Sequence, residues 1–381
     1  MSPLLTKLLG LLIIILGIVG LSSLSTKTKT LNTPLSYDRT ATTSIKTNTT
    51  TTSKNVPATT SPSTTKPITV KKPTATPTTQ TIQIPVATPL PQAMSSSTAE
   101  VNTEVRKSLV NILCMTTFNP LKAITGTGVI IDPRGIILTN AHVAQYYLLK
   151  NYAGPNSIDC FIRTGSPAVE KYRAELLFIS PLWVEENKNN LKEENPLGTG
   201  ENDFALLLIT KNVTGTPLTD TFQALDIETS DSNIDRKQSI DHVVAGYPAG
   251  FLGISAVERD LYTASAVARI QEIFTFDTTT VDLMAVGGNV VAQKGASGGA
   301  VVSTKDKKLV GLIVTTTDAK TTGERDLRAI TLSHVERSLR TSTGKGIKEY
   351  VSGNVNETLR AFQDSTFVYL AGILKNVLQT H

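Results

Sequence analysis

The sequence predicts an all-β fold that follows a long disordered N-terminal segment and ends in a helix. Two observations on the residues after 98 support this expectation. Short runs rich in β-branched residues recur between Gly, Pro and Asp, as the strands of a barrel or a sandwich do. Helical spacing of apolar residues is scarce until residues 351–378, where they recur every three or four positions. We therefore expect sheets first and a helix last.

The strand-like runs form two series of six. The first series is SLVNILCMTT, TGTGVIID, GIILTNAHV, SIDCFIRTG, KYRAELLFI and DFALLLI, and the second is HVVAGYP, DLYTASAVARIQEI, TTVDLMAV, GGAVVST, KLVGLIVTT and RAITLS. A short helix is expected before them, around residues 98–110. We expect the terminal helix to pack on the strands, with a membrane contact as the alternative.

The first 98 residues are predicted to form an export signal followed by a linker. Lys7 precedes an unbroken apolar run at residues 8–21, which is typical of an export signal. We interpret residues 1–24 as an uncleaved signal anchor, with a removed signal peptide as the alternative. Residues 25–98 are dominated by Thr, Ser and Pro, with too few apolar side chains to form a core, and predict a disordered linker. The expected location is outside the cytoplasm, membrane-anchored, or secreted if the signal is cleaved.

Charge and cysteine content exclude several functions. The formal net charge is +5, but seven lysines lie in the linker, and no basic patch interleaved with aromatics follows it. We therefore expect no nucleic-acid partner. The two cysteines and four histidines have no metal-ligand spacing, so neither a metal site nor a cofactor is predicted.

The strongest chemical motif is GASGG, which places Ser297 in a G-x-S-x-G frame. In an α/β-hydrolase this frame precedes a helix, and the acid and the histidine follow it. Here the β-branched run VVSTKDKKLVGLIV follows, which predicts a hairpin and argues against that class.

A serine hydroxyl needs a base to accept its proton, and the base needs a carboxylate to orient it. TNAHV presents His142 at the end of a strand–turn–strand run. NDFALLLI places Asp203 at the head of an apolar strand. The order His142, Asp203, Ser297 therefore predicts a catalytic triad.

These motifs resemble the trypsin-like peptidases, and specifically the HtrA-type bacterial branch. The resemblance rests on GTGVIIDPRGIILTNAHV, DFALLLI, VAGYPAG, GASGGAVVS and KLVGLIVTT, and covers roughly residues 101–342. It implies two six-stranded Greek-key barrels, a peptidase domain over residues 99–345, and a C-terminal helical segment over residues 346–381.

The resemblance also implies a mechanism and a kind of substrate. Ser297 attacks a peptide carbonyl, His142 acts as base and then as acid, and Asp203 orients it. The backbone N–H groups of Gly295 and Ser297 form the oxyanion hole. The substrates are proteins or peptides, and the sequence indicates no oligomeric state.

The chain departs from its relatives before the serine and after the peptidase region. Ala296 stands where digestive relatives carry aspartate and HtrA-type relatives carry asparagine, so a polar contact that could hold the loop is absent. About 40 residues follow residue 342, too few for the PDZ domain of HtrA proteins, so none is expected. A catalytically silent binding module on a stalk is the alternative to a tethered serine endopeptidase.

Family position also points to a specificity pocket and a disulfide. In this family the primary pocket is shaped by the residue six before the serine and by the strand after the serine. The first position is Val291 here, and the strand supplies Val314, Thr315 and Thr316. All are uncharged, which predicts preference for small or medium uncharged side chains. The first and fourth strands of such a barrel are neighbours and carry Cys114 and Cys160, so a disulfide is expected in an oxidising compartment, with two buried thiols as the alternative.

Overall fold

The computed structural model of the chain describes residues 96–380, except 117–120, 194–198, 219–220, 231–237, 251, 277–278, 317–318 and 320. The chain divides into two units, Met1–Pro85 and Val86–His381, and all described residues lie in the second. The expected signal segment and nearly all of the expected linker lie outside the described residues. The helix expected near residue 98 is α2, Ser96–Ser108, which begins within the last residues assigned to the linker.

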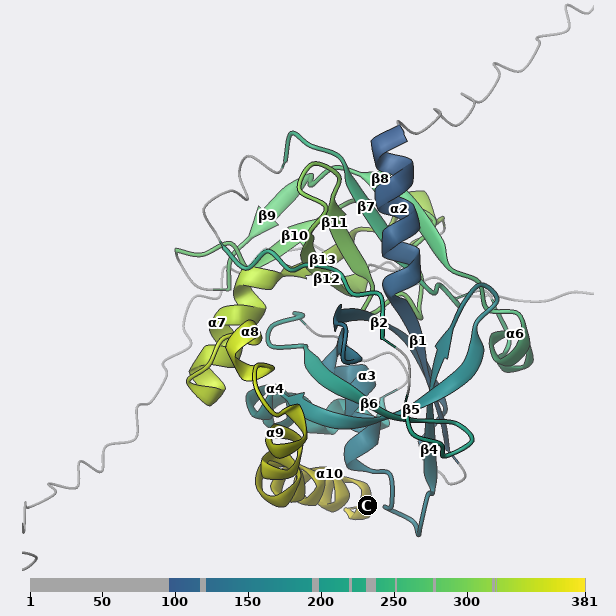
Figure 1. Cartoon of the computed structure of the whole chain (residues 1–381), viewed down its shortest axis with the longest axis vertical. Coiled ribbons are helices and arrows are strands. Elements are labelled where there is room, and N and C mark those ends of the chain that lie inside the picture. The colour runs from purple at the N-terminus through teal and green to yellow at the C-terminus, as the bar shows by residue number, and fades with distance from the viewer. Residues whose placement is uncertain are drawn as a thin grey trace, which may run out of the picture. The chain divides into compact units, whose positions relative to one another are not determined.

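The first six strands close into an antiparallel barrel with the order β1-β2-β3-β6-β5-β4 (Figure 1). The strands are β1 (Leu109–Thr116), β2 (Ile124–Asp132), β3 (Ile136–Thr139), β4 (Ile158–Thr164), β5 (Val169–Ile179) and β6 (Ala205–Asn212). Closure follows because β1 pairs with both β2 and β4. The first predicted half, including the pairing of its first and fourth strands, is confirmed.

The second half is an antiparallel sheet of seven strands in the order β8-β7-β11-β12-β13-β10-β9. The strands are β7 (His242–Gly246), β8 (Ala264–Ala268), β9 (Glu272–Phe274), β10 (Leu283–Ala285), β11 (Ala300–Ser303), β12 (Leu309–Thr316) and β13 (Leu327–Thr331). The sequence predicted six strands, because the run DLYTASAVARIQEI was taken as one. It breaks after Ala268, and its two parts pair with different neighbours, β8 with β7 and β9 with β10.

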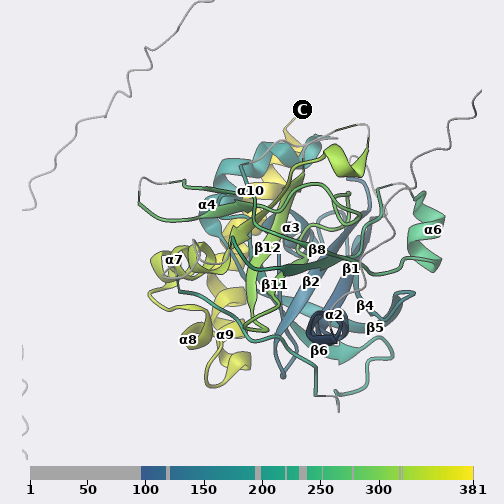
Figure 2. The same cartoon turned by 90° about the horizontal axis from the view of Figure 1, so that it is seen from above.

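Helices link and cover the two sheets (Figure 2). Besides α2, they are α3 (Ala141–Leu148), α4 (Pro181–Asn187), the 3-10 turns η1 (Lys188–Lys192) and η2 (Thr322–Glu324), α6 (Ile254–Arg259) and α7 (Leu332–Thr343). The sequence did not predict α3, α4, α6 or α7. For α7 a signal existed: Leu332, Val335 and Leu339 recur at helical spacing and are buried, and Gly344 ends the helix with a φ of 75°.

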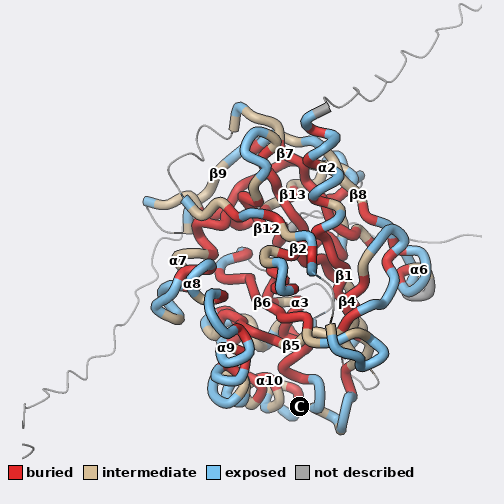
Figure 3. The backbone as a smooth tube through the Cα atoms, viewed as in Figure 1, coloured by how far each residue is buried: buried red, intermediate tan, exposed pale blue. Residues whose placement is uncertain are grey.

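The predicted C-terminal helix is a series of consecutive helical segments. They are α8 (Ile347–Tyr350), α9 (Val355–Phe362), the π-helical stretch η3 (Gln363–Phe367) and α10 (Val368–Gln379). Phe362 and Tyr350 pack on Phe178 of β5, with ring centroids 6.3 and 5.6 Å away. This side of the segment therefore belongs to the buried core in the middle of the molecule (Figure 3). Within the described part of the chain, no helix is long and apolar enough to cross a membrane.

Cys114 of β1 and Cys160 of β4 lie directly opposite one another, with 4.0 Å between their Cα atoms, and are joined by a disulfide. The bridge spans a sequence separation of 46 residues. A covalent link of this length restricts the unfolded chain much more than it restricts the folded barrel.

Loss of this bridge is expected to destabilise the peptidase region by about 2–4 kcal/mol, because the unfolded chain regains loop entropy. Urea unfolding of the full chain with and without a reducing agent measures the change. The double variant Cys114→Ala/Cys160→Ala is the control and should not respond to reduction. Equal midpoints for oxidised and reduced wild type would mean that the bridge does not form in solution.

Candidate active site

His142 lies in the first turn of α3. The sequence analysis placed it at a strand end, but β3 ends at Thr139 and Asn140 caps the helix with an extended backbone. Asn140 also fixes the acid's position, because its Nδ2 donates a hydrogen bond to the carbonyl oxygen of Asp203 over 2.8 Å. A rigid strand-to-helix corner therefore presents the imidazole, whose side chain is 27% exposed.

Asp203 lies two residues before β6 and holds His142 by two contacts. Its Oδ1 accepts a hydrogen bond from the His142 backbone N–H at 2.9 Å, and its Oδ2 lies 2.7 Å from His142 Nδ1. The carboxylate is almost buried, with a side-chain exposure of 7%. Burial of the imidazole disfavours its charged form, but the charge of Asp203 and the hydrogen bond to it outweigh this and raise the pKa of His142. The pair can therefore hold and stabilise an imidazolium.

Ser297 is half-buried and lies on the loop between β10 and β11. Its carbonyl oxygen accepts a hydrogen bond from Thr127 N–H at 2.7 Å, and the next residue, Gly298, donates from its N–H to Ile313 at 2.8 Å. Gly298 has a φ of 83°, and a Cβ there would overlap the carbonyl oxygen of Thr127. Only glycine therefore lets the serine loop lie this close to β2.

Thr127 of β2 joins the serine loop to the strands that carry His142. Its hydroxyl donates to the Gly295 carbonyl at 2.7 Å and accepts from Tyr247 N–H at 2.9 Å. Its carbonyl accepts from the hydroxyl of Thr139, three residues before His142, at 2.7 Å. Both threonines are fully buried, and no sequence motif marked them as part of the site. They tie the two halves of the molecule together at the site.

The structure brings His142 and Asp203 into direct contact and anchors Ser297 to the adjoining strands. No hydrogen bond between described residues joins the Ser297 hydroxyl to the imidazole. Such catalytic contacts are often long before substrate binds. Across the described residues, no cluster of three or more His, Cys, Asp or Glu side chains could hold a metal ion.

The loop before Ser297 leaves two donors available. Gly295 has a φ of 91°, and Ala296 N–H donates to Gln293 at 3.1 Å while its carbonyl accepts from Gly299 at 2.9 Å. The N–H groups of Gly295 and Ser297, by contrast, have no acceptor among the described residues. Ala296 itself is buried, and main-chain hydrogen bonds hold its loop.

A family model describes the region that contains this arrangement. Residues 126–312 match the model of the trypsin-like peptidase domain. The chain carries a trypsin-like peptidase domain. The matched segment includes His142, Asp203 and Ser297, and it confirms the family expected from the sequence motifs. The chain is therefore a serine endopeptidase by family.

Solved structures of proteases are also similar to the chain. One is Deg5, which is 14% identical with a TM-score of 0.41, and the match covers 63% of this chain and 91% of Deg5. Another is the active form of the Rv3671c protease from M. tuberculosis, which is 20% identical with a TM-score of 0.39, and the match covers 70% of this chain and 92% of that one. A third is the HtrA-type protease AlgW with a tripeptide, which is 17% identical with a TM-score of 0.40, and the match covers 66% of this chain and 65% of that one. These TM-scores are too low to support more than the family model does. No curated protein matches the chain.

The peptidase domain does not bring the four expected pocket residues into one described surface. Val291 is fully buried in the smaller apolar cluster, and Val314 is 4% exposed and belongs to the larger one. Val314 packs toward Gly200, in the turn before Asp203. The side chains of Thr315 and Thr316 lie outside what the structure describes. The specificity pocket therefore stays a prediction.

Part of the polar segment before Asp203 is helical. Its first twelve residues form α4 and η1, over residues 181–192. Ser180 caps α4 by accepting from Trp183 N–H, and Trp183, Val184 and Leu191 are buried. These apolar side chains among acidic neighbours were the missed signal.

A second histidine–aspartate pair lies close to Asp203, on the side of helix α7. His334 of α7 places its Nδ1 3.2 Å from Asp282 Oδ1, and its Nε2 accepts from Asn202 N–H at 3.4 Å. Ser338, one turn later, donates to Asn202 Oδ1 at 2.6 Å. Asn202 has a left-handed backbone with a φ of 56°. Helix α7 therefore holds the residue next to Asp203 in a strained conformation.

We expect His334→Ala to lower kcat by between about tenfold and about a hundredfold, with a smaller change in KM. Asn202 loses an anchor, so Asp203 can shift relative to His142, and small displacements of catalytic groups cost rate in this range. His334→Gln retains an acceptor and should recover part of kcat. Thr341→Ala, on the exposed side of α7, is the control. Equal losses for His334→Gln and His334→Ala would assign His334 a purely packing role.

Proposed function

We propose that the chain is an exported, membrane-tethered serine endopeptidase in which Ser297 is the nucleophile, His142 the general base and Asp203 the residue that orients the base. The observation that carries the proposal is the two-point contact of Asp203 with His142. One carboxylate oxygen binds the backbone and the other faces Nδ1. This contact leaves Nε2 to act on the serine. The family match and the anchored serine loop support the same assignment.

The reaction proceeds through an acyl-enzyme. The Ser297 oxygen bonds to the peptide carbonyl carbon as its proton passes to His142 Nε2, and the N–H groups of Gly295 and Ser297 stabilise the oxyanion. Each such donor is typically worth about 3 kcal/mol in the transition state. His142 then gives its proton to the leaving amine. Water, activated by His142, breaks the ester and releases the acid product.

The expected substrates are unfolded protein segments or peptides. The family match supports peptide bonds as the substrate class. We propose a preference for small or medium uncharged side chains before the cleaved bond, based on the neutral residues at positions 291 and 314–316.

Export and tethering rest on the N-terminal residues and on the disulfide. Residues 1–24 carry the apolar signal, and residues 25–98 are long enough to hold the domain away from a membrane. Disulfides persist in oxidising compartments, which agrees with a peptidase domain outside the cytoplasm. Fractionation of cells that express the full chain or a variant without residues 1–24 tests this. Release of both forms into the medium would contradict tethering.

Cleavage of unfolded casein by the full chain, together with labelling by a serine-directed organophosphonate, tests the peptidase activity. We expect turnover, with the label on Ser297. A folded protein that neither cleaves casein nor takes up label would instead favour a silent binding module built on the same fold. Thermal unfolding of the same sample establishes that the protein is folded.

A further inference from the structure

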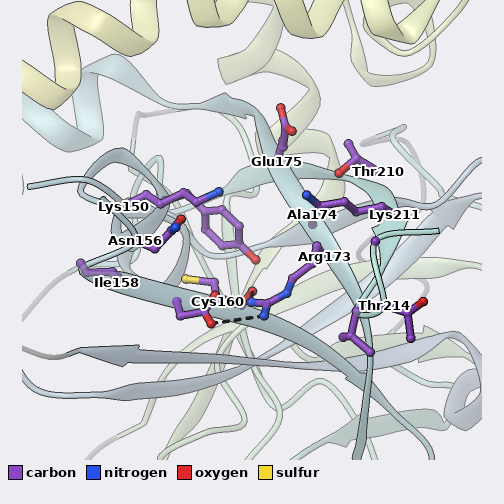
Figure 4. A pocket seen from close by; sticks show the side chains of 14 residues that line it. Lys150, Asn156, Ile158, Cys160, Arg173, Ala174, Glu175, Thr210, Lys211 and Thr214 are labelled. Carbon is purple, nitrogen blue, oxygen red and sulfur yellow. Dashed lines mark hydrogen bonds and ion pairs between the residues drawn. The ribbon is translucent and has the colours of Figure 1, made fainter. Parts of the chain in front are cut away.

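A polar pocket of about 360 Å³ opens on the first barrel and shares no lining residue with the candidate active site (Figure 4). Its wall is formed by the end of α3 and by β4, β5 and β6. This volume lies in the range of pockets that bind small molecules. The peptidase mechanism makes no use of it.

Two lysines give the pocket its charge. Lys150 follows α3 and Lys211 lies on β6, and the two side chains extend toward one another across the opening (Figure 4). Both are exposed. Neither forms an ion pair with a carboxylate among the described residues. Two like charges that converge on one pocket favour an anion there.

The other charged groups of the pocket are already engaged. Arg173 forms an ion pair with Asp159 and donates to the Cys160 carbonyl at 3.1 Å. Glu175 accepts a hydrogen bond from Gln363 Nε2 at 2.7 Å. Three cationic side chains and two carboxylates line the pocket, so its lining has a formal charge of +1.

Two hydroxyl groups at the pocket are buried and lack a hydrogen-bond partner within the described residues. They are the hydroxyls of Tyr147, in α3, and Thr210, in β6. Tyr147 is only 6% exposed, and burial raises its pKa, so the phenol keeps its proton as a donor. A buried polar group without a partner costs stability, and a ligand oxygen could supply the missing partner.

We propose that this pocket is a binding site for a small oxyanion, either a carboxylate or a phosphate group. Lys150 and Lys211 provide the charge, and the hydroxyls of Tyr147 and Thr210 donate hydrogen bonds to the oxygens. Charge-assisted bonds of this kind are the strong ones in proteins. Tyr147 lies in the same helix as His142, so an occupied pocket steadies the helix that presents the catalytic base.

Thermal unfolding of the full chain with the Ser297→Ala substitution tests binding without interference from peptidase activity. Trp183 is the single tryptophan and reports unfolding by its fluorescence. Inorganic phosphate, acetate and chloride are compared at matched ionic strength. We expect the midpoint to rise with the logarithm of phosphate or acetate concentration, because a ligand that binds only the folded state stabilises it. The anion that gives the larger rise in the unfolding midpoint is the preferred ligand. No rise beyond that in chloride overturns the proposal.

Three variants separate a built site from general charge effects. Lys150→Gln/Lys211→Gln should abolish the oxyanion-dependent rise, whereas Lys171→Gln, an exposed lysine on β5 outside the pocket, should retain it. Tyr147→Phe should weaken binding by about tenfold while leaving the protein without ligand at least as stable, since an unpartnered hydroxyl is removed. Equal rises in the double variant and in Lys171→Gln, or an unchanged response in Tyr147→Phe, would contradict the assignment.

Discussion

Ser297→Ala is expected to lower kcat on casein or a peptide by on the order of 10⁶. Alanine has no hydroxyl to form the acyl-enzyme, so His142 and Asp203 have nothing to activate. Initial rates with a fluorogenic peptide measure the loss. The serine makes no side-chain hydrogen bond within the described residues, and its loop is held through the backbone by Thr127 and Ile313. The fold should therefore be unaffected.

The matched control for this change is Ser365→Ala, an exposed serine in the C-terminal helical segment. It should keep wild-type activity and the same unfolding midpoint. A Ser297→Ala protein that still cleaves at more than about a hundredth of the wild-type rate would rule out Ser297 as the nucleophile. Residual cleavage that also survives the organophosphonate would indicate a contaminating protease.

The three residues of the proposed triad could be located from the sequence because each lies in a short local pattern. The run before His142 is a strand, a turn and a strand, and the structure reproduces it as β2 and β3. Asp203 precedes an apolar strand, which is β6. The glycines around Ser297 are required where they stand, since Gly298 has no space for a side chain. Such information lies within a few residues and survives without tertiary context.

Helix α3 could not be recognised in the same way. Seven of its eight residues are buried, so no polar face marks a helical period. Its sequence, AHVAQYYL, is as compatible with a buried strand as with a helix. Packing against β4, β5 and neighbouring elements decided the outcome, which the sequence does not encode locally. His142 was therefore assigned to the end of a strand.

The residues that hold the site together were missed because their partners are remote in sequence. Thr127 reaches Gly295 across a separation of 168 residues, and His334 reaches Asn202 across 132. No periodicity or short motif encodes such pairs. The same holds for the oxyanion pocket, whose walls come from α3 and three strands and which only the folded barrel assembles.

Asp203→Asn is expected to lower kcat by about 10⁴ while leaving the backbone of the site in place. The amide oxygen can still accept from His142 N–H, as Oδ1 does now. The amide nitrogen then faces Nδ1 and donates to it, which moves the imidazole proton to Nε2. A protonated Nε2 cannot accept the proton of Ser297, so the base is present but in the wrong tautomer.

The pH dependence provides a second, independent measure of the same contact. Asp203 raises the pKa of His142 in the wild type against the effect of burial. The reaction needs the neutral imidazole, so kcat/KM rises as pH increases through this pKa. In Asp203→Asn the negative charge that raises the pKa of His142 is gone, while the burial that lowers it remains. The acid limb, which is the low-pH side of the profile of kcat/KM against pH, should therefore move to lower pH. Asp241→Asn changes a half-buried carboxylate that pairs with Arg269; it is the control and should leave the acid limb in place. If the acid limb does not move in Asp203→Asn, another group supplies the charge that the imidazolium needs. The assignment of Asp203 would then fail even if the rate had dropped.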